Sequence, residues 1–317
     1  MYALPNMDLW KGRTDSLIDK DEFRIHQIVK DNQTTSANNT CGIIGFSCEE
    51  GVRRNKGRLG SKEAPNEIRK SLSSLSWHGQ SADSLVDFGN IICENQQLEA
   101  AQAELGSHVE KILSKNMFPV ILGGGHETFY GHYLGIRSSV GPNAKIGILN
   151  IDAHFDLRSY EEITSSGTMF KQILDNDHQA SYLPIGIQRY GNTKKLFDTA
   201  TTLGCSWILE EELVDENSEE NENKILNFIN QHDYIILTLC MDVINASEAP
   251  GVSAPSSFGL SGKMVRQLIR KITSHTKTIS FDICEVNPSL DCDNRTVKLA
   301  ANLINEVFMC VERRLAI

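Results

Sequence analysis

The stretch KIGILNIDAHFD, residues 145–156, joins an apolar run to three polar residues at alternate positions. In an extended strand, alternate side chains point to the same side, so Asp152, His154 and Asp156 would face one point. Burial of an unpaired carboxylate costs several kcal/mol unless a cation or a hydrogen-bond donor compensates for it. Because all three side chains are of metal-binding types, the stretch predicts a bound cation at the end of a buried strand.

The rest of the chain repeats this alternation of short apolar runs and longer amphipathic stretches. Helical spacing appears in residues 96–115, 261–273 and 294–313. The last of these carries an apolar stripe made of Val297, Ala301, Ile304, Phe308 and Val311. The apolar, β-branched runs are CGIIGFS, LVDFGNIIC, FPVILGGG, KIGILNID, SYLPIGI, CSWILEE, YIILTLCMDV and TISFDICEV. The pattern predicts a three-layer α/β/α fold with a central, mostly parallel sheet of about eight strands and ligands at the strands' carboxyl ends.

The organisation and composition of the chain narrow its class. We find no internal repeat or linker, so we expect a single domain over residues 1–317, with an irregular N-terminal arm at about residues 1–38. The net charge of −10 argues against nucleic-acid partners, and the longest apolar run is too short to span a membrane. The eight scattered cysteines and the lack of a secretory signal favour a cytoplasmic location.

Three further apolar runs also end in chemically capable residues. Three glycines precede His126, which would allow close packing and unusual φ angles beside the imidazole. Cys240 and Asp242 lie two apart, hence on one side of their predicted strand, and Glu285 follows the last run. Cys240 alone also suits the core, because free cysteine packs as a small hydrophobe, and we assign His132 to the core or surface. Together these residues could hold two divalent ions.

Taken together, these motifs resemble those of the ureohydrolase superfamily, the arginase and agmatinase group. The matching stretches cover nearly the whole chain in order and are GVRRNKGRLGSKEAPNEIR (51–69), GGGHE (123–127), DAHFD (152–156) and CMDVINASEAPG (240–251). Within the superfamily, the sequence most resembles the formimidoylglutamase branch, which acts in histidine degradation. That narrower likeness rests on NIDAHFDLR, SSGTMF and DNRTVKLAANL. The resemblance implies an arginase-like fold.

For the metal site, the resemblance implies two Mn²⁺ ions per subunit. The implied ligands are His126, Asp152 and Asp156 for the first ion and Asp152, His154 and Asp242 for the second. A bridging carboxylate of the superfamily falls on Cys240, and a thiolate suits softer ions than Mn²⁺. We therefore expect the second ion to be the more weakly held. A disulfide between Cys240 and Cys284 is an alternative fate for the thiol.

The resemblance also implies a reaction, the hydrolysis of N-formimidoyl-L-glutamate to L-glutamate and formamide. A hydroxide that bridges the two ions would attack the formimidoyl carbon. Glu285 would hold the planar NH groups through charge-assisted hydrogen bonds. Arginases have a proton-transfer histidine where this chain has Phe170, so Asp156, the metal-bound species or solvent would protonate the leaving amine.

Recognition of the acidic substrate would fall to residues that follow the metal motif. Arg158 could grip a carboxylate with two parallel hydrogen bonds, or it could instead pair with Glu161 or Glu162 on the surface. The further candidates for carboxylate contacts are Ser166, Thr168 and Asn192. Asn55 and Arg58 fit a loop-bracing role.

Two other functions remain open at this point. One is another amidinohydrolase that acts on a guanidino acid or an agmatine-like substrate. The other is a catalytically impaired ureohydrolase-like protein, which Cys240 and Phe170 would explain. In every case the partner is a small molecule, with no nucleic acid or membrane, and a homo-oligomer is compatible with the sequence.

Overall fold

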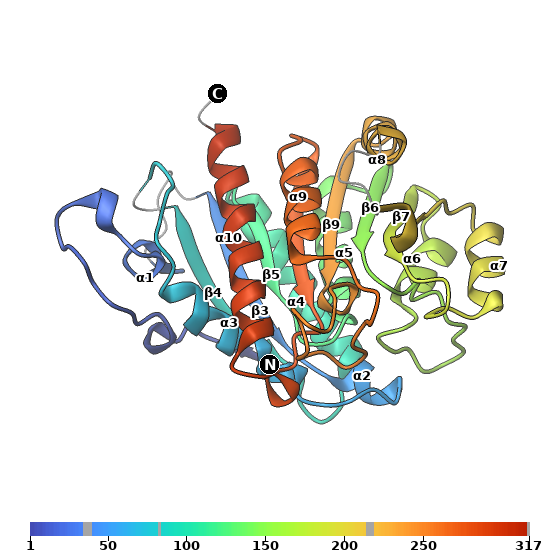
Figure 1. The fold of residues 1–317 in the computed structure, drawn as a ribbon, viewed down its shortest axis with the longest axis horizontal. Coiled ribbons are helices and arrows are strands. Elements are labelled where there is room, and N and C mark those ends of the chain that lie inside the picture. The colour runs from blue at the N-terminus through green and yellow to red at the C-terminus, as the bar shows by residue number, and fades with distance from the viewer. Residues whose placement is uncertain (34–39, 82–83, 214–218, 316–317) are drawn as a thin grey trace.

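A mostly parallel sheet forms the centre of the molecule (Figure 1). The computed structural model describes residues 1–33, 40–81, 84–213 and 219–315, and within these ranges the sheet has ten strands. The strands are β1 (Tyr2–Ala3), β2 (Lys30–Asp31), β3 (Cys41–Ser47), β4 (Leu85–Ile92), β5 (Phe118–Leu122), β6 (Ile146–Ile151), β7 (Ala180–Ile187), β8 (Ile208–Leu209), β9 (Tyr234–Cys240) and β10 (Thr278–Cys284). Their order is β1-β4-β3-β5-β10-β9-β6-β7-β8, and β2 also pairs with β4. Every pairing is parallel except that of β1 with β4.

Helices cover both faces of the sheet. The α-helices are α1 (Ile25–Ile28), α2 (Glu50–Arg54), α3 (Ala64–Ser73), α4 (Leu98–Ser114), α5 (Thr128–Val140), α6 (Met169–Asn176), α7 (Lys194–Thr202), α8 (Glu219–Gln231), α9 (Gly262–Thr273) and α10 (Arg295–Leu315). The 3₁₀ helices are η1 (Met7–Leu9), η2 (Lys20–Glu22), η3 (Ser61–Glu63), η4 (Glu210–Leu213), η5 (Met241–Val243) and η6 (Pro288–Leu290). Helices α3, α8, α9 and α10 pack on one face and α4 to α7 on the other, which confirms the predicted three layers. Figure 1 looks onto the face that α9 and α10 cover.

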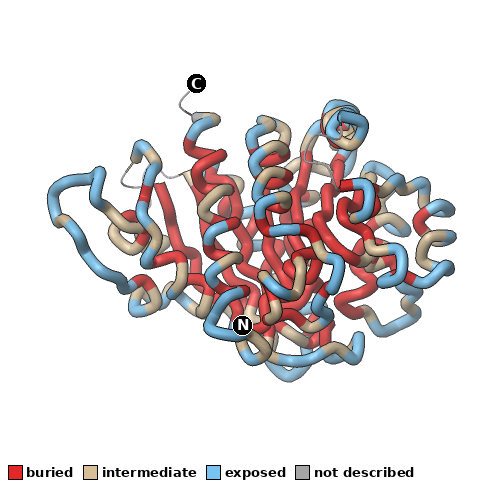
Figure 2. Tube along the Cα trace, viewed as in Figure 1, coloured by how far each residue is buried: buried red, intermediate tan, exposed pale blue. Residues whose placement is uncertain are grey.

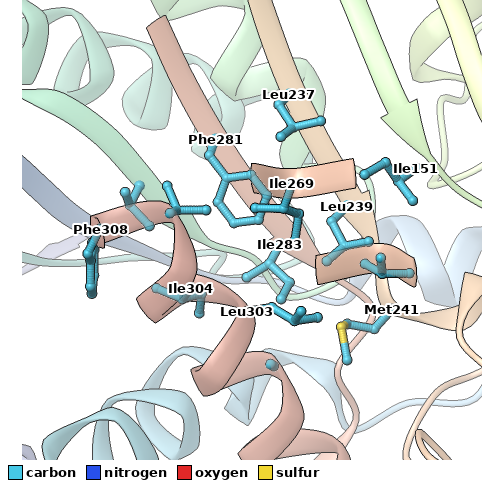
Figure 3. Close-up of a cluster of buried hydrophobic side chains, with 14 of the residues drawn as sticks. Ile151, Leu237, Leu239, Met241, Ile269, Phe281, Ile283, Leu303, Ile304 and Phe308 are labelled. Carbon is cyan, nitrogen blue, oxygen red and sulfur yellow. The ribbon is translucent and has the colours of Figure 1, made fainter. Parts of the chain in front are cut away.

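The apolar core lies in two clusters, one on each face of the sheet. The central strands are buried along their length (Figure 2), as expected where helices cover both faces of parallel strands. On one face, Leu237 and Phe281 of neighbouring strands lie near Ile304 of α10 (Figure 3). The stripe predicted in α10 is buried there in full. A single apolar face on each helix thus fixes the layer to which it belongs.

The N-terminal segment is more ordered than predicted. All eight predicted strands form, but β1 and β2 raise the total from eight to ten within the described residues. At two residues each, these strands are too short to leave a periodic signal in the sequence. The buried Trp10 ties the segment to the sheet through a 2.7 Å hydrogen bond from its Nε1 to Asp87. Residues 34–39 of the predicted arm lie outside the described residues. No helix among the described residues is long and apolar enough to cross a membrane.

The order of the strands decides where a site can form. Strands β5 and β6 follow each other in the sequence, but in the sheet β10 and β9 lie between them. The carboxyl ends of these four strands therefore meet at one edge of the sheet. In open α/β sheets, ligands bind beyond the carboxyl ends of the strands, where the strand order reverses.

Candidate functional site

Polar side chains follow all four of these central strands. His126 comes after β5, Glu285 after β10, Asp242 after β9 and Asp152 after β6. Because the strands are parallel neighbours, residues from four distant parts of the sequence lie together. Three of these residues are at most 5% exposed, and Glu285 is 7% exposed. The structure thus brings together the residues that sequence analysis identified as metal-binding candidates.

The DAHFD segment reaches this arrangement in a different way from the one predicted. Strand β6 ends at Ile151, so Asp152, His154 and Asp156 lie in the loop beyond it and not on an extended strand. Asp156 has a φ of 48°, in the left-handed region, which turns the chain back towards the site. His154 donates its backbone N–H to Asp152 Oδ1 at 2.8 Å. The side chains of Asp152, His154 and Asp156 therefore converge because the loop bends, and not because alternate residues of a strand face the same side.

The glycines before His126 supply close packing. A Cβ at Gly124 would lie 1.9 Å from the Cys48 carbonyl oxygen, so a larger residue cannot be accommodated there. None of the three glycines has a φ in the left-handed region, so the predicted unusual φ angles are wrong. Instead Glu285 has one, at 67°. Its Oε1 accepts a 2.9 Å hydrogen bond from the backbone N–H of His126, which joins two strand ends at the site.

The ligand-type atoms form two overlapping groups. His126, Asp152 and Cys240 make one group and Asp152, His154 and Asp242 the other, with the atoms of each group within 4.8 Å of one another. Asp156 lies beside the first group, with its Oδ2 3.0 Å from His126 Nδ1. In the second group, His154 Nδ1 lies 3.1 Å from Asp242 Oδ2. The fully buried Asp152 belongs to both groups, as a carboxylate shared by two cations would.

The charges and hydrogen bonding of these side chains fit a bound divalent cation. Burial alone would lower the pKa of His126, but Asp152 and Asp156 raise it well above its ordinary value. Burial raises the pKa of Glu285 to about 8, and the charges of Glu127 and Asp242 add to that shift. In addition, Asp242 Oδ1 is buried without a hydrogen-bond partner among the described residues. Excess carboxylate and an orphaned acceptor fit a divalent cation.

Cys240 is packed into the same cluster. Its side chain is 2% exposed, and burial together with the carboxylates of Asp152 and Asp242 raises its pKa well above the ordinary value. A bound cation would reverse this shift, because a coordinating thiol is deprotonated. Cys284 lies directly opposite Cys240 in the pairing of β10 with β9, and both thiols are free. The predicted disulfide is therefore absent from this structure, although the two residues are neighbours.

A cavity of about 370 Å³ opens above these residues. Its floor is acidic, whereas its wall carries the cationic side chains Lys56, Arg58 and Arg158. Arg58 is occupied, since its Nε and Nη2 donate to the carbonyl oxygens of Ser253 and Val252, as a loop-bracing residue would. Arg158 is exposed, and no hydrogen bond or ion pair joins its guanidinium to another residue in the described ranges, including Glu161 and Glu162. Its guanidinium is thus available to a ligand.

The other predicted substrate residues differ in their positions. Ser166 is buried and lines the cavity. Thr168 does not line it, because its hydroxyl is used within its own loop by Ser165 and Gln172. Asn192 lines the cavity, but its amide braces the DAHFD loop: its Nδ2 donates to Ala153 O, and its Oδ1 accepts from the backbone of Phe155. Ser166 is the one of the three best placed to reach a ligand.

Phe170 occupies a different place from the one the resemblance implied. Its ring is fully buried and packs edge-on against His126, with 5.5 Å between ring centroids, and it stacks on Tyr182. It does not line the cavity. The residue therefore packs against the imidazole of His126 and contributes no titratable group to the cavity.

Sequence analysis missed several polar residues beneath the site. Asn150 donates from Nδ2 to Asp152 Oδ2 at 3.0 Å, and it also bonds to the hydroxyl of Tyr182. Thr238 Oγ1 lies 3.1 Å from His126 Nε2. Both Asn150 and Thr238 interrupt apolar runs that form buried strands. A polar residue inside such a run was the available signal, because buried polar groups need partners.

Comparison with known protein sequences finds similarity to one family, the one that the sequence motifs resemble. Residues 39–310 match the model of the Arginase family. The formimidoylglutamase of Geobacillus thermodenitrificans (strain NG80-2) is 50% identical over 317 residues, which cover 99% of this chain and 98% of the relative. That of Lysinibacillus sphaericus (strain C3-41) is 51% identical over 311 residues, 96% of this chain and 97% of the relative.

Solved structures share the fold. The formimidoylglutamase of Bacillus subtilis superimposes with a TM-score of 0.81 over 93% of this chain and 94% of that one, at 22% identity. A formiminoglutamase of Trypanosoma cruzi with Mn²⁺ gives a TM-score of 0.80 over 91% of this chain and 97% of that one, at 21% identity. These likenesses show that the three-layer fold is that of arginase-like proteins.

Proposed function

The chain belongs to the arginase family, and we propose that it is a manganese-dependent hydrolase that converts N-formimidoyl-L-glutamate and water to L-glutamate and formamide. Relatives named as formimidoylglutamases, about 50% identical over nearly their whole length, support this substrate. Two features of the cavity support this function most strongly: two ligand groups at its base share Asp152, and the Arg158 guanidinium on its wall has no partner among the residues that the structure describes. The first arrangement suits an amidine hydrolase, and the second suits an acidic substrate.

In this proposal, the two ligand groups would hold two Mn²⁺ ions. His126, Asp152 and Asp156 would hold one ion, and Asp152, His154 and Asp242 would hold the other. When bound, the ions lower the pKa of a water molecule and so supply hydroxide at neutral pH. Cys240 groups with His126 and Asp152, ligands of the first ion, and not with His154 and Asp242, so its position does not support the expectation that the second ion is the weaker one. A thiol offers a single donor atom in place of a carboxylate's two. We therefore infer that the two positions are unequally filled, since Mn²⁺ prefers oxygen ligands.

The protein's own residues position the substrate for attack. Glu285 has one carboxylate oxygen fixed by the His126 amide, and its other oxygen accepts an N–H of the formimidoyl group. Oxygen from water adds to the formimidoyl carbon, the bond from that carbon to the glutamate nitrogen breaks, and the nitrogen takes up a proton. Asp156 is our candidate for delivering that proton, because it lines the cavity and Phe170 cannot act there. The products are formamide and glutamate.

Arg158 selects the substrate by charge. Its guanidinium pairs with a carboxylate of the glutamate portion, where a planar fork of N–H donors matches a carboxylate in geometry. Ser166 adds a hydroxyl nearby in the cavity wall. The ammonium group of agmatine would meet the same cation and be repelled. Arg158 thus favours acidic over basic amidines, and the charges of Lys56 and Arg58 in the same cavity wall act in the same direction.

The proposed enzyme acts in the cytoplasm. The eight cysteines are scattered along the sequence without a C-x-x-C pair, as suits a protein of a reducing compartment. The site also depends on one of these thiols, Cys240, remaining reduced. This placement suits an enzyme that acts on a small, charged metabolite.

A comparison of substrates tests the proposal. The purified chain, supplied with Mn²⁺, should consume N-formimidoyl-L-glutamate and leave agmatine and arginine unchanged. Glutamate and formamide should appear in equal amounts. Release of urea from a guanidino substrate at a higher kcat/KM would overturn the assignment in favour of another amidinohydrolase. No turnover of any amidine by protein with bound Mn²⁺ would instead indicate a catalytically impaired family member.

A further inference from the structure

A line of buried polar groups runs from His126 away from the cavity into the core. His126 Nε2 lies 3.1 Å from Thr238 Oγ1, and the Thr238 hydroxyl donates to Asp282 Oδ1 at 2.6 Å. On the far side, His132 Nδ1 lies 2.5 Å from Asp282 Oδ2. Cys284 Sγ also donates to Asp282 Oδ1, at 3.2 Å. Asp282 thus accepts three hydrogen bonds in the interior of the protein.

The fold fixes the parts of this line in place. Thr238 of β9 and Asp282 of β10 are directly opposite each other in the pairing of the two strands. His132 belongs to α5, the helix that begins two residues after His126. Thr238, Asp282 and His132 are fully buried. The line therefore links the loop that carries His126, the two central strands and the helix above them.

The two ring nitrogens of His126 face different partners. Nδ1 faces Asp152 and Asp156, at 3.1 and 3.0 Å, on the side of the proposed ion. Nε2 faces Thr238. If Nδ1 binds a cation through its lone pair, the proton of the neutral ring is on Nε2, which donates to the Thr238 hydroxyl. That hydroxyl can accept from His126 because its own proton points to Asp282.

We propose that Thr238 and Asp282 are positioning residues for the metal ligand His126. They hold the imidazole in the tautomer and orientation that present Nδ1 to the ion. The negative charge of Asp282 polarises the Thr238 hydroxyl, and this makes Nδ1 a stronger electron-pair donor to the ion. His132 holds Asp282 in turn. This inference rests on the proposed manganese centre and deepens it. Hydrogen bonds of this kind to a metal-binding histidine typically change metal affinity by about 10–100-fold.

A purely structural role accounts poorly for this arrangement. Apolar residues would join β10 to α5 at least as well, because replacing hydrogen-bonded buried polar groups with apolar groups of the same shape can be nearly neutral or stabilising. Ligand-type atoms of His126, Asp282 and Cys284 also lie within 4.8 Å of one another. However, the Thr238 hydroxyl and the Cys284 thiol already donate to Asp282 there. Asp282 therefore serves as an acceptor behind the ligand and not as a ligand.

Manganese titration of substituted proteins tests the proposal. Thr238→Val keeps the shape of the side chain but removes the hydroxyl, whereas Thr238→Ser keeps the hydroxyl. Ser280→Ala is the matched control, because Ser280 lies two residues before Asp282 on β10, is fully buried, and its hydroxyl has no partner among the described residues. Each full-length protein is freed of metal, titrated with Mn²⁺ by calorimetry, and melted without metal.

We expect Thr238→Val to weaken binding of one Mn²⁺ by about 10–100-fold, with Thr238→Ser and Ser280→Ala within about threefold of wild type. If Thr238→Val fails to fold, Asp282→Asn is measured in its place, with the same expected loss. Wild-type affinity in Thr238→Val, or an equal loss in Ser280→Ala, would overturn the positioning role alone. Absence of Mn²⁺ binding by the wild-type protein would instead overturn the metal centre on which it rests.

Discussion

The substitution Arg158→Ala examines the basis of substrate choice. The Arg158 side chain is exposed in the cavity wall, and within the described part of the chain its guanidinium has no hydrogen-bond or ion-pair partner. Only its backbone N–H is used, in a 2.9 Å hydrogen bond to Gly167 O. The substitution should therefore remove a contact to substrate while leaving the fold intact, with a change in unfolding free energy within about 0.5 kcal/mol.

The size of the kinetic effect follows from the contact that is lost. A hydrogen bond to a charged group contributes about 1.5–3 kcal/mol, and each 1.4 kcal/mol corresponds to a factor of ten. We expect kcat/KM for N-formimidoyl-L-glutamate to fall by about 10–150-fold. Most of the loss should appear in KM, because the carboxylate is held equally before and during the reaction. Steady-state assays of glutamate release, with Mn²⁺ in excess, measure both constants.

Two further variants make the result specific. Arg158→Lys keeps the charge but loses the planar fork, so its kcat/KM should lie between those of Arg158→Ala and wild type. Arg266→Ala removes an exposed arginine of α9 whose nearest acid, Glu306, is 4.0 Å away, and its kinetics should match wild type. Wild-type kinetics in Arg158→Ala, or the same loss in Arg266→Ala, would refute the assigned recognition role.

Three other predictions concern the metal centre. Asp152→Asn should abolish activity and reduce Mn²⁺ measured by mass spectrometry to well below one per chain, since both ligand groups share this carboxylate; retention of two ions would contradict that. Cys240→Asp adds a buried acid to the cluster, so it should lower the melting temperature of the metal-free protein and raise the Mn²⁺ occupancy towards two per chain. The same fall in melting temperature with an unchanged Mn²⁺ stoichiometry would place Cys240 outside the metal site. Carboxylates raise the pKa values of His126 and His154 above 6.5, so Mn²⁺ must displace protons and its affinity should tighten as pH rises beyond 6.5; equal affinity from pH 6 to 9 in calorimetry would argue against these ligands.

The architecture was largely predictable because it depends on local pattern. Each of the seven strands of five or more residues coincides with an apolar run in the sequence, the two-residue β8 lies inside another such run, and α10 shows its buried stripe plainly. Strands β1 and β2 escaped prediction because pairing with β4, and not their own two residues, determines them. Tertiary contacts such as the bond from Trp10 to Asp87 have no periodic signature.

The candidate site was predictable in its residues but not in its backbone. His126 and the DAHFD segment could be identified because residues of metal-binding types follow predicted strands. The left-handed backbone conformations of Asp156 and Glu285 could not, because they arise only when the strand ends come together. Such conformations cost about 1–3 kcal/mol each and persist where surrounding structure imposes them. Thr168 looked equivalent to Ser166 in sequence, yet its hydroxyl is used inside its own loop. Partners of this kind follow from three-dimensional packing alone.

The fate of oxygen from water shows which carbon–nitrogen bond the protein breaks. N-formimidoyl-L-glutamate carrying carbon-13 at the formimidoyl carbon is incubated with the Mn²⁺-loaded protein in water enriched in oxygen-18, and the products are followed by NMR and mass spectrometry. The labelled carbon should appear in formamide, with one oxygen-18 atom, in step with free glutamate. Appearance of the label in N-formylglutamate, with release of ammonia, would contradict the proposed reaction, because the other carbon–nitrogen bond would then have been broken.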